Sequence, residues 1–397
     1  MSSAVSIVRC QTYHPDQVLE KLRQSLQLLG GIETFVKKGD RVLLKPNLLA
    51  GKSPEKAVTT HPSIVRGMIQ IVREAGGLPT VGDSPAIGST IKAAEKAGIR
   101  EIANSLNCPI VEFNRPTPAP EDPVRGRRIF KDIEIDKAIL EADVLINLPK
   151  WKTHAQMLLT LGVKNLFGCV CGAKKALWHL KAGEDRDLFA QVLVDIYQVL
   201  RPALTVLDGI TGMEGNGPGS GSPVSLGLIL ASRDALSLDQ AVCDLLRIPR
   251  RSLMTNRVAF ERGLGKDSSG KDLIEIVGEK TEHVRLPDFH FPTLSRIDWS
   301  LPRFIKKALK GALTGKPVID RRLCKNCEQC VEICPPKALG ANGEILSFDY
   351  GRCIRCFCCL EVCPEGAIAI QQGWALRLSS KLKAKQCCKL QVPSKQV

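Results

Sequence analysis

A repeated cysteine pattern near the C-terminus decides how this chain is organised. It reads Cys324-x2-Cys327-x2-Cys330-x3-Cys334-Pro335 and then Cys353-x2-Cys356-x2-Cys359-x3-Cys363-Pro364. In each run, one backbone turn can aim the first three thiols at three corners of an iron–sulfur cube, and the fourth thiol, before proline, ligates the other cube. The pattern therefore predicts two 4Fe-4S clusters: cluster A on Cys324, Cys327, Cys330 and Cys363, and cluster B on Cys334, Cys353, Cys356 and Cys359.

The alternatives for these cysteines are a zinc site or a disulfide scaffold. Zinc ligands usually come as two separated pairs, and disulfides give no reason to repeat one spacing twice. Residues 317–373 resemble the bacterial two-cluster ferredoxins, with Asn342-Gly343 as the expected turn of a first hairpin. Because so small a module has little core, we expect the clusters to hold it together.

Length and composition indicate a globular protein of two or three domains. The chain has 397 residues, of which 44% are hydrophobic and 24% charged. It contains no apolar run of the roughly 20 residues that span a bilayer, and its first residues do not resemble a signal peptide. Sixteen cysteines in such a chain favour a reducing compartment. We therefore expect a cytoplasmic protein, in an anaerobic microbe.

The net charge of +15 is concentrated late in the chain, where residues 301–397 hold 17 Lys/Arg against 7 Asp/Glu. Such a basic region suits an acidic redox partner, or less favourably an anionic membrane surface. We expect no nucleic-acid binding, because the sequence shows no recognition fold and only 5% aromatic residues for stacking bases.

The first 300 residues alternate strand and helix signals, which predicts an α/β fold with a mostly parallel sheet and flanking helices, followed by a small α+β ferredoxin domain. The predicted strands are 5–8, 42–44, 144–148, 204–207 and 225–230, with another ending at Val81. The predicted helices are 15–29, 62–75, 90–97, 185–200 and 235–246.

Polar motifs follow strand after strand, which indicates one cleft at the carboxyl edge of the sheet. They are Lys45-Pro46-Asn47, Gly82-Asp83-Ser84-Pro85, Lys150-Trp151-Lys152-Thr153-His154 and Asp208-Gly209. We expect a small anionic ligand there, or a further anionic cofactor. The predicted binding residues are Lys45, Asn47, His61, Lys150, Lys152, Asn165, Asp208 and Asn216, and the predicted catalytic residues are His154, Asp83 and Lys164.

Several of these residues have simpler interpretations. Asp83 and His61 are each suited to capping the helix that follows. Lys164 lies between apolar neighbours on a probable helix, and a buried lysine without an anion is costly, so we favour the cleft for it. The glycine-rich segment 208–223 could cradle an anion with its amides. Cys169 and Cys171 fit packing thiols better than metal or redox ligands.

A set of motifs in one order resembles the family known as domain of unknown function 362 over about residues 5–290. They are Lys45-Pro46-Asn47-Leu48-Leu49, Thr60-His61-Pro62, Gly82-Asp83-Ser84-Pro85, Leu148-Pro149-Lys150, Lys152-Thr153-His154, Gly162-x-Lys164-Asn165-x-x-Gly168 and Asp208-Gly209…Glu214-Gly215-Asn216-Gly217-Pro218. The resemblance implies an α/β domain, often fused to a two-cluster ferredoxin, and no settled reaction.

A looser similarity connects the chain with the nickel-pincer lactate racemases. Those enzymes have a Thr-His turn, and a histidine ten residues before the lysine that tethers the cofactor. Here His154 precedes Lys164 by ten residues, Thr60-His61 lies upstream and His179 follows. The glycine-rich flanks of the racemases are not reproduced. The similarity implies a related fold, and isomerase-like chemistry as an alternative.

The domain boundaries follow from these patterns. We expect a cleft domain at 1–285, a linker with a basic amphipathic helix at 286–316, the ferredoxin domain at 317–373 and a basic tail at 374–397. Helix 301–313 suits domain docking better than a membrane surface. Cys358 breaks the ligand spacing and is expected to be a bystander, and Cys387-Cys388 to be ordinary exposed thiols.

The combined sequence hypothesis is an iron–sulfur oxidoreductase or electron-transfer protein. Its clusters would pass electrons to or from an anionic ligand in the cleft, with His154 or Asp83 as the proton-transfer group. There are two alternatives. The first is a pure electron relay without chemistry of its own, and the second is an isomerase-like reaction.

Overall fold

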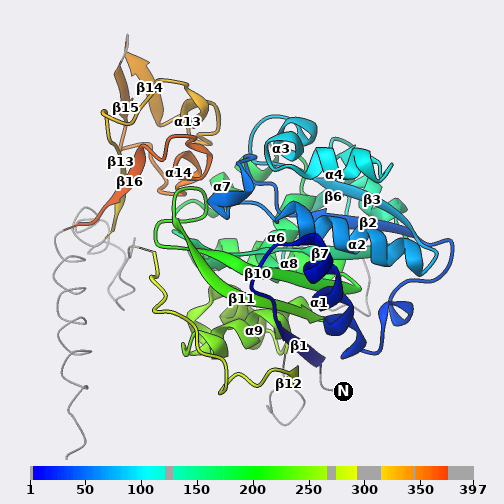
Figure 1. Cartoon of the computed structure of the whole chain (residues 1–397). Coiled ribbons are helices and arrows are strands. Elements are labelled where there is room, and N and C mark those ends of the chain that lie inside the picture. The colour runs from blue at the N-terminus through cyan, green and yellow to red at the C-terminus, as the bar shows by residue number, and fades with distance from the viewer. Residues whose placement is uncertain are drawn as a thin grey trace, which may run out of the picture.

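The structure is a computed structural model that describes residues 3–120, 128–172, 174–265, 274–292, 314–342 and 345–373. A large α/β body is coloured from blue to yellow-green, and a small orange-to-red domain lies beside it (Figure 1). The predicted fold class is confirmed: a mostly parallel sheet with flanking helices and a ferredoxin-like C-terminal region. The predicted helix 301–313, the tail 374–397 and Cys387-Cys388 lie outside the described residues.

The described strands of the body form a ten-stranded sheet with the order β12-β1-β11-β10-β7-β2-β3-β4, and with β8 and β9 attached to β10. From β10 to β4 all neighbours are parallel, whereas β11 runs antiparallel to both β10 and β1. The strands are β1 Ser3–Arg9, β2 Arg41–Pro46, β3 Leu78–Asp83, β4 Ile110–Glu112, β7 Val144–Leu148, β8 Lys150–His154, β9 Leu158–Thr160, β10 Leu204–Glu214, β11 Ser222–Ser232 and β12 Ile274–Gly278. A separate small hairpin pairs β5 Pro116–Pro118 with β6 Glu134–Asp136.

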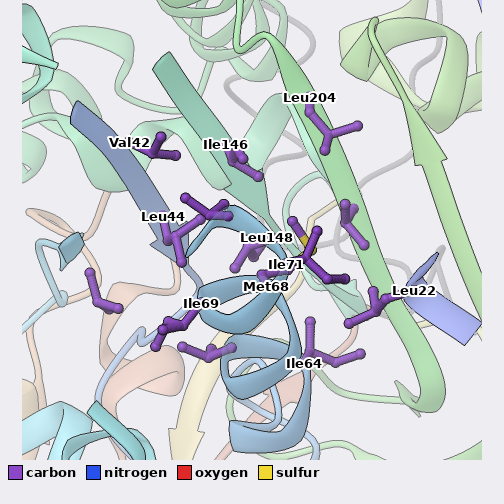
Figure 2. Close-up of a cluster of buried hydrophobic side chains, with 14 of the residues drawn as sticks. Leu22, Val42, Leu44, Ile64, Met68, Ile69, Ile71, Ile146, Leu148 and Leu204 are labelled. Atoms are coloured by element: carbon purple, nitrogen blue, oxygen red, sulfur yellow. The ribbon is translucent and has the colours of Figure 1, made fainter. Parts of the chain in front are cut away.

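Helices cover both faces of this sheet. They are α1 Pro15–Gln27, α2 Pro62–Glu74, α3 Thr90–Lys96, α4 Ile99–Ser105, α5 Lys137–Glu141, α6 Gly162–Asn165, α7 Lys174–Ala182, α8 Arg186–Leu200, α9 Ala235–Leu245 and α10 Met254–Glu261. Figure 2 shows how α2 packs Ile64, Met68 and Ile71 against Leu44 of β2 and Ile146 of β7 in one buried cluster. The strands read as continuous apolar runs because both sheet faces are buried.

The C-terminal domain is built from two short strand pairs and two short helices. β13 Lys316–Ile319 pairs with β16 Ile368–Gln371, and β14 Leu339–Asn342 pairs with β15 Ile345–Phe348. Its helices α13 Gln329–Glu332 and α14 Cys358–Val362 each belong to one cysteine run. The register pairs Asn342 with Ile345, as expected for the predicted Asn-Gly turn, although residues 343–344 lie outside the described residues.

Two predictions of local structure need correction. The segment 208–223 is mostly a hairpin rather than a loop, because β10 continues to Glu214 and β11 begins at Ser222. The polar residues Lys150–His154 form strand β8 rather than a strand exit. Among the described helices, none combines the length and the apolar composition needed to cross a bilayer.

Candidate functional site

A pocket with about 710 Å3 of non-atom space, open solvent included, lies between the α/β body and the C-terminal domain. Its walls come from the ends of β2 and β3, from β8, from α6 and α7, and from α14 of the ferredoxin-like domain. Its polar lining consists of Lys45, Asn47, Asp83, Ser84, Lys152, His154, Thr160, Lys164, Asn165, Lys175, His179 and Glu361.

The sheet brings the first polar side chains together. β2 and β3 are parallel neighbours with Leu44 opposite Val81, so the residues that follow them meet at one edge. Lys45 Nζ lies 2.7 Å from Asp83 Oδ1, and both side chains are at most 3% exposed. The Leu48 N–H donates to Asp83 Oδ2 at 2.9 Å. The carboxylate of Asp83 therefore interacts with Lys45 and with the backbone that follows β2. It does not cap the next helix, α3, whose N-cap residue is Ser89.

Gly168 lies directly against this ion pair, because it has no side chain. A Cβ at Gly168 would lie 2.2 Å from Asp83 Oδ1 and 2.6 Å from Lys45 Nζ. Since no side chain fits in that space, the turn after α6 can pack directly on the two charges. The Gly168 backbone carbonyl also accepts a hydrogen bond from the Ser84 N–H at 3.2 Å.

A chain of hydrogen bonds positions Lys152. Its ammonium donates to Asn47 Oδ1 at 2.8 Å and to the Val58 carbonyl at 2.7 Å. Asn47 Nδ2 donates to Asn165 Oδ1 at 2.8 Å, and Asn165 Nδ2 donates to Asn147 Oδ1 at 2.8 Å. Burial lowers the pKa of Lys152 well below its usual value, and the charge of Lys164 lowers it further. An anion in the pocket would favour the protonated form of Lys152.

His154 lies at the contact between the two domains. Its Nδ1 accepts from the Gln156 and Met157 N–H groups at 3.1 and 3.2 Å, which leaves the proton of the neutral ring on Nε2. That Nε2 lies 2.9 Å from Glu361 Oε1 of α14. Burial lowers the pKa of His154 to about 4. His154 is therefore neutral at neutral pH and presents an N–H to the Glu361 carboxylate.

Glu361 contributes a carboxylate to the wall of the pocket. Burial alone would raise its pKa, but the neighbouring His154, Lys164 and His179 outweigh burial and hold that pKa at about 2. Glu361 is thus ionised, and it faces three basic side chains from the other domain.

Lys164 differs from the other pocket lysines in its polar contacts. Within the part of the chain that the structure describes, it makes no hydrogen bond or ion pair, and its ammonium lies 6.0 Å from the ring centroids of Phe167 and Phe189. Nearby, two buried pocket atoms, Thr160 Oγ1 and His179 Nδ1, have no hydrogen-bond partner among the described residues. Buried polar atoms are rarely left unpaired, so this wall has unused capacity for a ligand.

Lys175 adds a further ammonium from α7. It donates to Ser84 Oγ at 2.6 Å and to the Pro85 carbonyl at 3.3 Å. Burial lowers its pKa to about 8, while the charge of Asp83 opposes that shift. Four lysines and two histidines thus face two carboxylates, Asp83 and Glu361, across one pocket. The arrangement suits an anionic ligand.

Four predicted binding residues do not line this pocket. Lys150 donates to Asp208 Oδ2 at 2.9 Å and to the Tyr13 hydroxyl at 2.8 Å, and Tyr13 donates to Asp208 Oδ1 at 2.7 Å. His61 stacks on Tyr13 and caps α2 by accepting from the Ser63 N–H, as the capping interpretation predicted. These side chains satisfy one another in a separate buried network. Asn216 lies in the β10–β11 connection and is not among the lining residues either.

Sequence reasoning missed Glu361, Lys175, Thr160 and Phe167 as pocket residues. The sequence did not indicate Glu361, because a glutamate between two predicted cluster ligands is usually expected to be a surface residue. His179 had entered only through the racemase similarity. Cys358, expected to be a bystander, lines the pocket.

The cysteines of predicted cluster A surround a common space. Cys324, Cys327, Cys330 and Cys363 line a second pocket of about 350 Å3, open solvent included, together with apolar side chains such as Ile319 and Leu346. Four thiols around an apolar hollow fit the donor set of a 4Fe-4S cube. For predicted cluster B, burial raises the pKa of Cys334 and of Cys353, and the nearby Cys356 raises both further. The ligand assignments remain predictions.

Cys169 and Cys171 belong to a hydrophobic cluster on the α8 face of the sheet. Burial raises the pKa of each thiol to about 12. Both are therefore protonated at neutral pH, as suits packing thiols.

The β10–β11 connection holds the C-terminal domain in place. Lys52 Nζ donates to the carbonyls of Gly219 at 2.7 Å and Cys363 at 3.0 Å, so one side chain joins the connection to a cluster loop. A Cβ at Gly219 would lie 2.3 Å from the Glu361 carbonyl oxygen. The glycine-rich segment therefore serves as a docking surface for α14, and its role as an anion cradle stays a prediction.

Replacing Gly219 with alanine is expected to loosen this docking, because the added methyl group must displace the backbone of α14. Overpacking of this kind costs about 1–3 kcal/mol. Hydrogen exchange of residues 358–362 should become faster, while that of β2 and β7 stays unchanged. Gly340→Ala is the control, since a Cβ there meets no atom within 4 Å. Unchanged exchange in α14 of Gly219→Ala would contradict the docking role.

Comparisons with known proteins agree with the two-part architecture. Residues 42–244 match the family described as "Domain of unknown function (DUF362)", and residues 316–364 match a "4Fe-4S dicluster domain". A thylakoid-associated protein of Synechocystis sp. is 41% identical over 320 residues, which are 78% of this chain and 94% of that protein. The lactate racemase apoprotein from Thermoanaerobacterium thermosaccharolyticum is similar with a TM-score of 0.38 and 12% identity, over 61% of this chain and 56% of that one.

Proposed function

Because the chain belongs to the DUF362 family and carries a 4Fe-4S dicluster domain with an iron–sulfur electron-transfer role, we propose that it is an oxidoreductase whose clusters exchange electrons with an anionic ligand in the interdomain pocket. One observation carries the proposal. The cluster domain supplies Glu361 and Cys358 to the wall of the same pocket that Lys152, His154 and Lys164 line from the other domain. A relay without chemistry of its own would have no use for such a shared pocket.

The chain's own residues have distinct tasks in this proposal. Lys152, Lys164 and Lys175 hold the anion, and the Asn47–Asn165 chain fixes the direction of Lys152. The neutral His154 presents its Nε2 N–H at the pocket wall, where it can donate a hydrogen bond to negative charge that develops on the ligand. Lys45 and Asp83 neutralise each other and shape the floor. When bound, the clusters supply one-electron transfer.

The setting of the protein follows from the same features. We propose that it works in a reducing, cytoplasmic compartment, because oxygen-sensitive clusters and protonated packing thiols persist there. An external redox protein with an acidic docking face is the proposed electron partner, since residues 301–316 and 374–397, on either side of the cluster-bearing residues, hold 11 Lys/Arg and no Asp/Glu.

The test of the function begins with protein purified without oxygen, whose bound small molecule is identified by mass spectrometry. Dithionite-reduced protein is then mixed with that molecule. We expect the visible absorbance of the clusters to recover as the molecule is reduced, and Lys164→Met to lose the molecule during purification. If no anionic molecule copurifies, and none of the anions offered reoxidises the clusters, the proposal fails and the relay remains.

Anion binding should depend on pH through Lys175. Its pKa is lowered to about 8, so its charge, and the affinity for an anion, is present below pH 8 and is lost as the pH rises through it. Sulfate is a suitable probe, since it stays a dianion over this range. Calorimetry from pH 6.5 to 9.5 should show falling affinity. Lys175→Met should bind about tenfold more weakly at pH 7 and show a smaller pH effect.

Lys181→Met is the matched control for this experiment. Lys181 belongs to the same helix, α7, but its side chain is 53% exposed and pairs with Asp132 instead of facing the pocket. Sulfate affinity of Lys181→Met should equal that of the unmodified chain. An affinity for sulfate that does not change across pH 8 would contradict the role of Lys175.

A further inference from the structure

We propose that the two clusters have unequal roles: cluster B exchanges electrons with the pocket ligand, and cluster A exchanges them with an external one-electron redox protein. This inference rests on the proposed function and adds an order of transfer to it. It follows from comparing the two cysteine runs position by position, because each residue of the first run has a counterpart 29 positions later.

Two positions of the second run are buried although their counterparts in the first run are exposed. Cys327 is exposed, whereas its counterpart Cys356 is 7% exposed. Glu332 is also exposed, whereas its counterpart Glu361 is 7% exposed and lies against His154. Two copies of one sequence pattern have therefore been placed in opposite environments. The first faces solvent, and the second faces the α/β domain.

The pocket contacts the C-terminal domain only through neighbours of cluster B ligands and through Glu361, as far as the described residues show. Cys358 directly precedes Cys359, and Ile333 directly precedes Cys334, and both line the pocket. Lys164 lines the same pocket as Cys358. Because electron transfer becomes slower with distance, the cluster on this side is the one placed to exchange electrons with a pocket ligand.

Cluster A has the opposite surroundings. Its hollow is lined by Cys324, Cys327 and the exposed Lys325, and none of these lines the ligand pocket. The adjoining Leu323 is 49% exposed. The exposed leucine offers an apolar contact, and the charges around it are mixed, because Arg322 pairs with Asp320, and Glu328 is exposed like Arg321 and Lys325. An apolar side chain surrounded by charged residues fits a redox protein that approaches from solvent.

The electrons balance without any bond being made or broken in the relay. The external protein and cluster A exchange one electron, so that one is oxidised as the other is reduced. Cluster A and cluster B then exchange that electron, and cluster B and the ligand exchange it in turn. The same order serves either direction of flow.

The test compares the reduction potentials of the two clusters in the full chain, by redox titration monitored with electron paramagnetic resonance. The cluster signals are assigned with Cys327→Ser and Cys356→Ser, which occupy equivalent positions in the two runs. Reduction adds negative charge, so removing a nearby positive charge lowers the potential. We expect Lys164→Met to lower the potential of cluster B more than that of cluster A, and Lys325→Met to do the reverse.

A larger effect of Lys164→Met on cluster A, or no effect on cluster B, would overturn the assignment. Unchanged iron content and circular dichroism verify that each variant is folded and loaded. The outcome is distinguishable from failure of the proposed function, since it needs no ligand. If cluster B responds but no anion reoxidises the clusters, the order of the clusters stands and the proposed function fails.

A kinetic measurement tests the outer surface independently. Lys325→Glu should slow electron exchange with an acidic flavodoxin by about tenfold at low salt, because like charges oppose the encounter. Lys37→Glu is the control, since this exposed lysine precedes β2, at the sheet edge opposite the pocket. Equal rates for both variants would show that the flavodoxin does not approach through cluster A.

Discussion

Replacing Asp83 with alanine is expected to lower the free energy of unfolding of the α/β domain by about 3–5 kcal/mol, because it leaves Lys45 buried without its counter-ion. Both side chains are at most 3% exposed, and their charged atoms lie 2.7 Å apart. The variant also frees the Leu48 N–H, which now donates to Asp83 at 2.9 Å. Denaturation followed by circular dichroism at pH 7 measures the loss.

Two further variants separate the ion pair from general damage. The double variant Lys45→Met/Asp83→Leu removes both charges and should recover much of the lost stability, since apolar side chains often replace a buried ion pair well. Glu74→Ala removes an exposed pair with Arg23, in which both side chains are 52% exposed. It should change stability by less than about 1 kcal/mol. A similarly small effect of Asp83→Ala would refute the structural role of the pair.

Removal of iron from the purified protein is expected to unfold the C-terminal domain and leave the α/β domain intact. Among the described residues of the small domain, the hydrophobic core cluster has nine buried members, three of which are the predicted ligands Cys330, Cys359 and Cys363. Without iron these thiols cannot hold the two runs together, and the remaining apolar contacts are too few for a domain of this size. The expected result is a domain that depends on its clusters.

Hydrogen exchange with mass spectrometry, before and after chelation under reducing conditions, provides the measurement. Peptides covering 314–342 and 345–373 should lose their protection, whereas those covering β2, β7 and β10 should keep it and act as the internal control. Loss of Glu361 from the pocket wall should also speed exchange around His154. If the chelated domain stays protected, its fold is independent of iron and the clusters are not structural.

The fold was largely predictable because local patterns and tertiary packing agree. The apolar run around Leu44 and the amphipathic stripe of α2 each predict an element that is buried in the structure. The prediction failed at Lys150–His154, because these polar residues form a strand that their sequence does not indicate. β8 is polar and still wholly buried, because Lys150 meets Asp208, Lys152 meets Asn47, and His154 meets Glu361. Such pairing between distant residues leaves no local signal.

The candidate site was predictable in part for the same reason. Lys45, Asn47 and Asp83 follow neighbouring parallel strands, so their meeting is a consequence of topology. Lys150 and Asp208 follow the same logic, but they neutralise each other with Tyr13 outside the pocket. The strand-exit rule selects the correct edge of the sheet, and it cannot tell which charged residues turn toward the ligand and which turn toward one another.

By itself, the sequence determined the cluster-binding pattern and the alternation of strands and helices, since both depend on residues close together in the chain. The tertiary structure alone decided that α14 closes the pocket, that Glu361 faces His154, and that Cys356 is buried while its counterpart Cys327 is exposed. The two runs carry the same spacing, and their difference arises only from what packs against them. Contacts between distant segments depend on the shape of two folded domains, which no local pattern encodes.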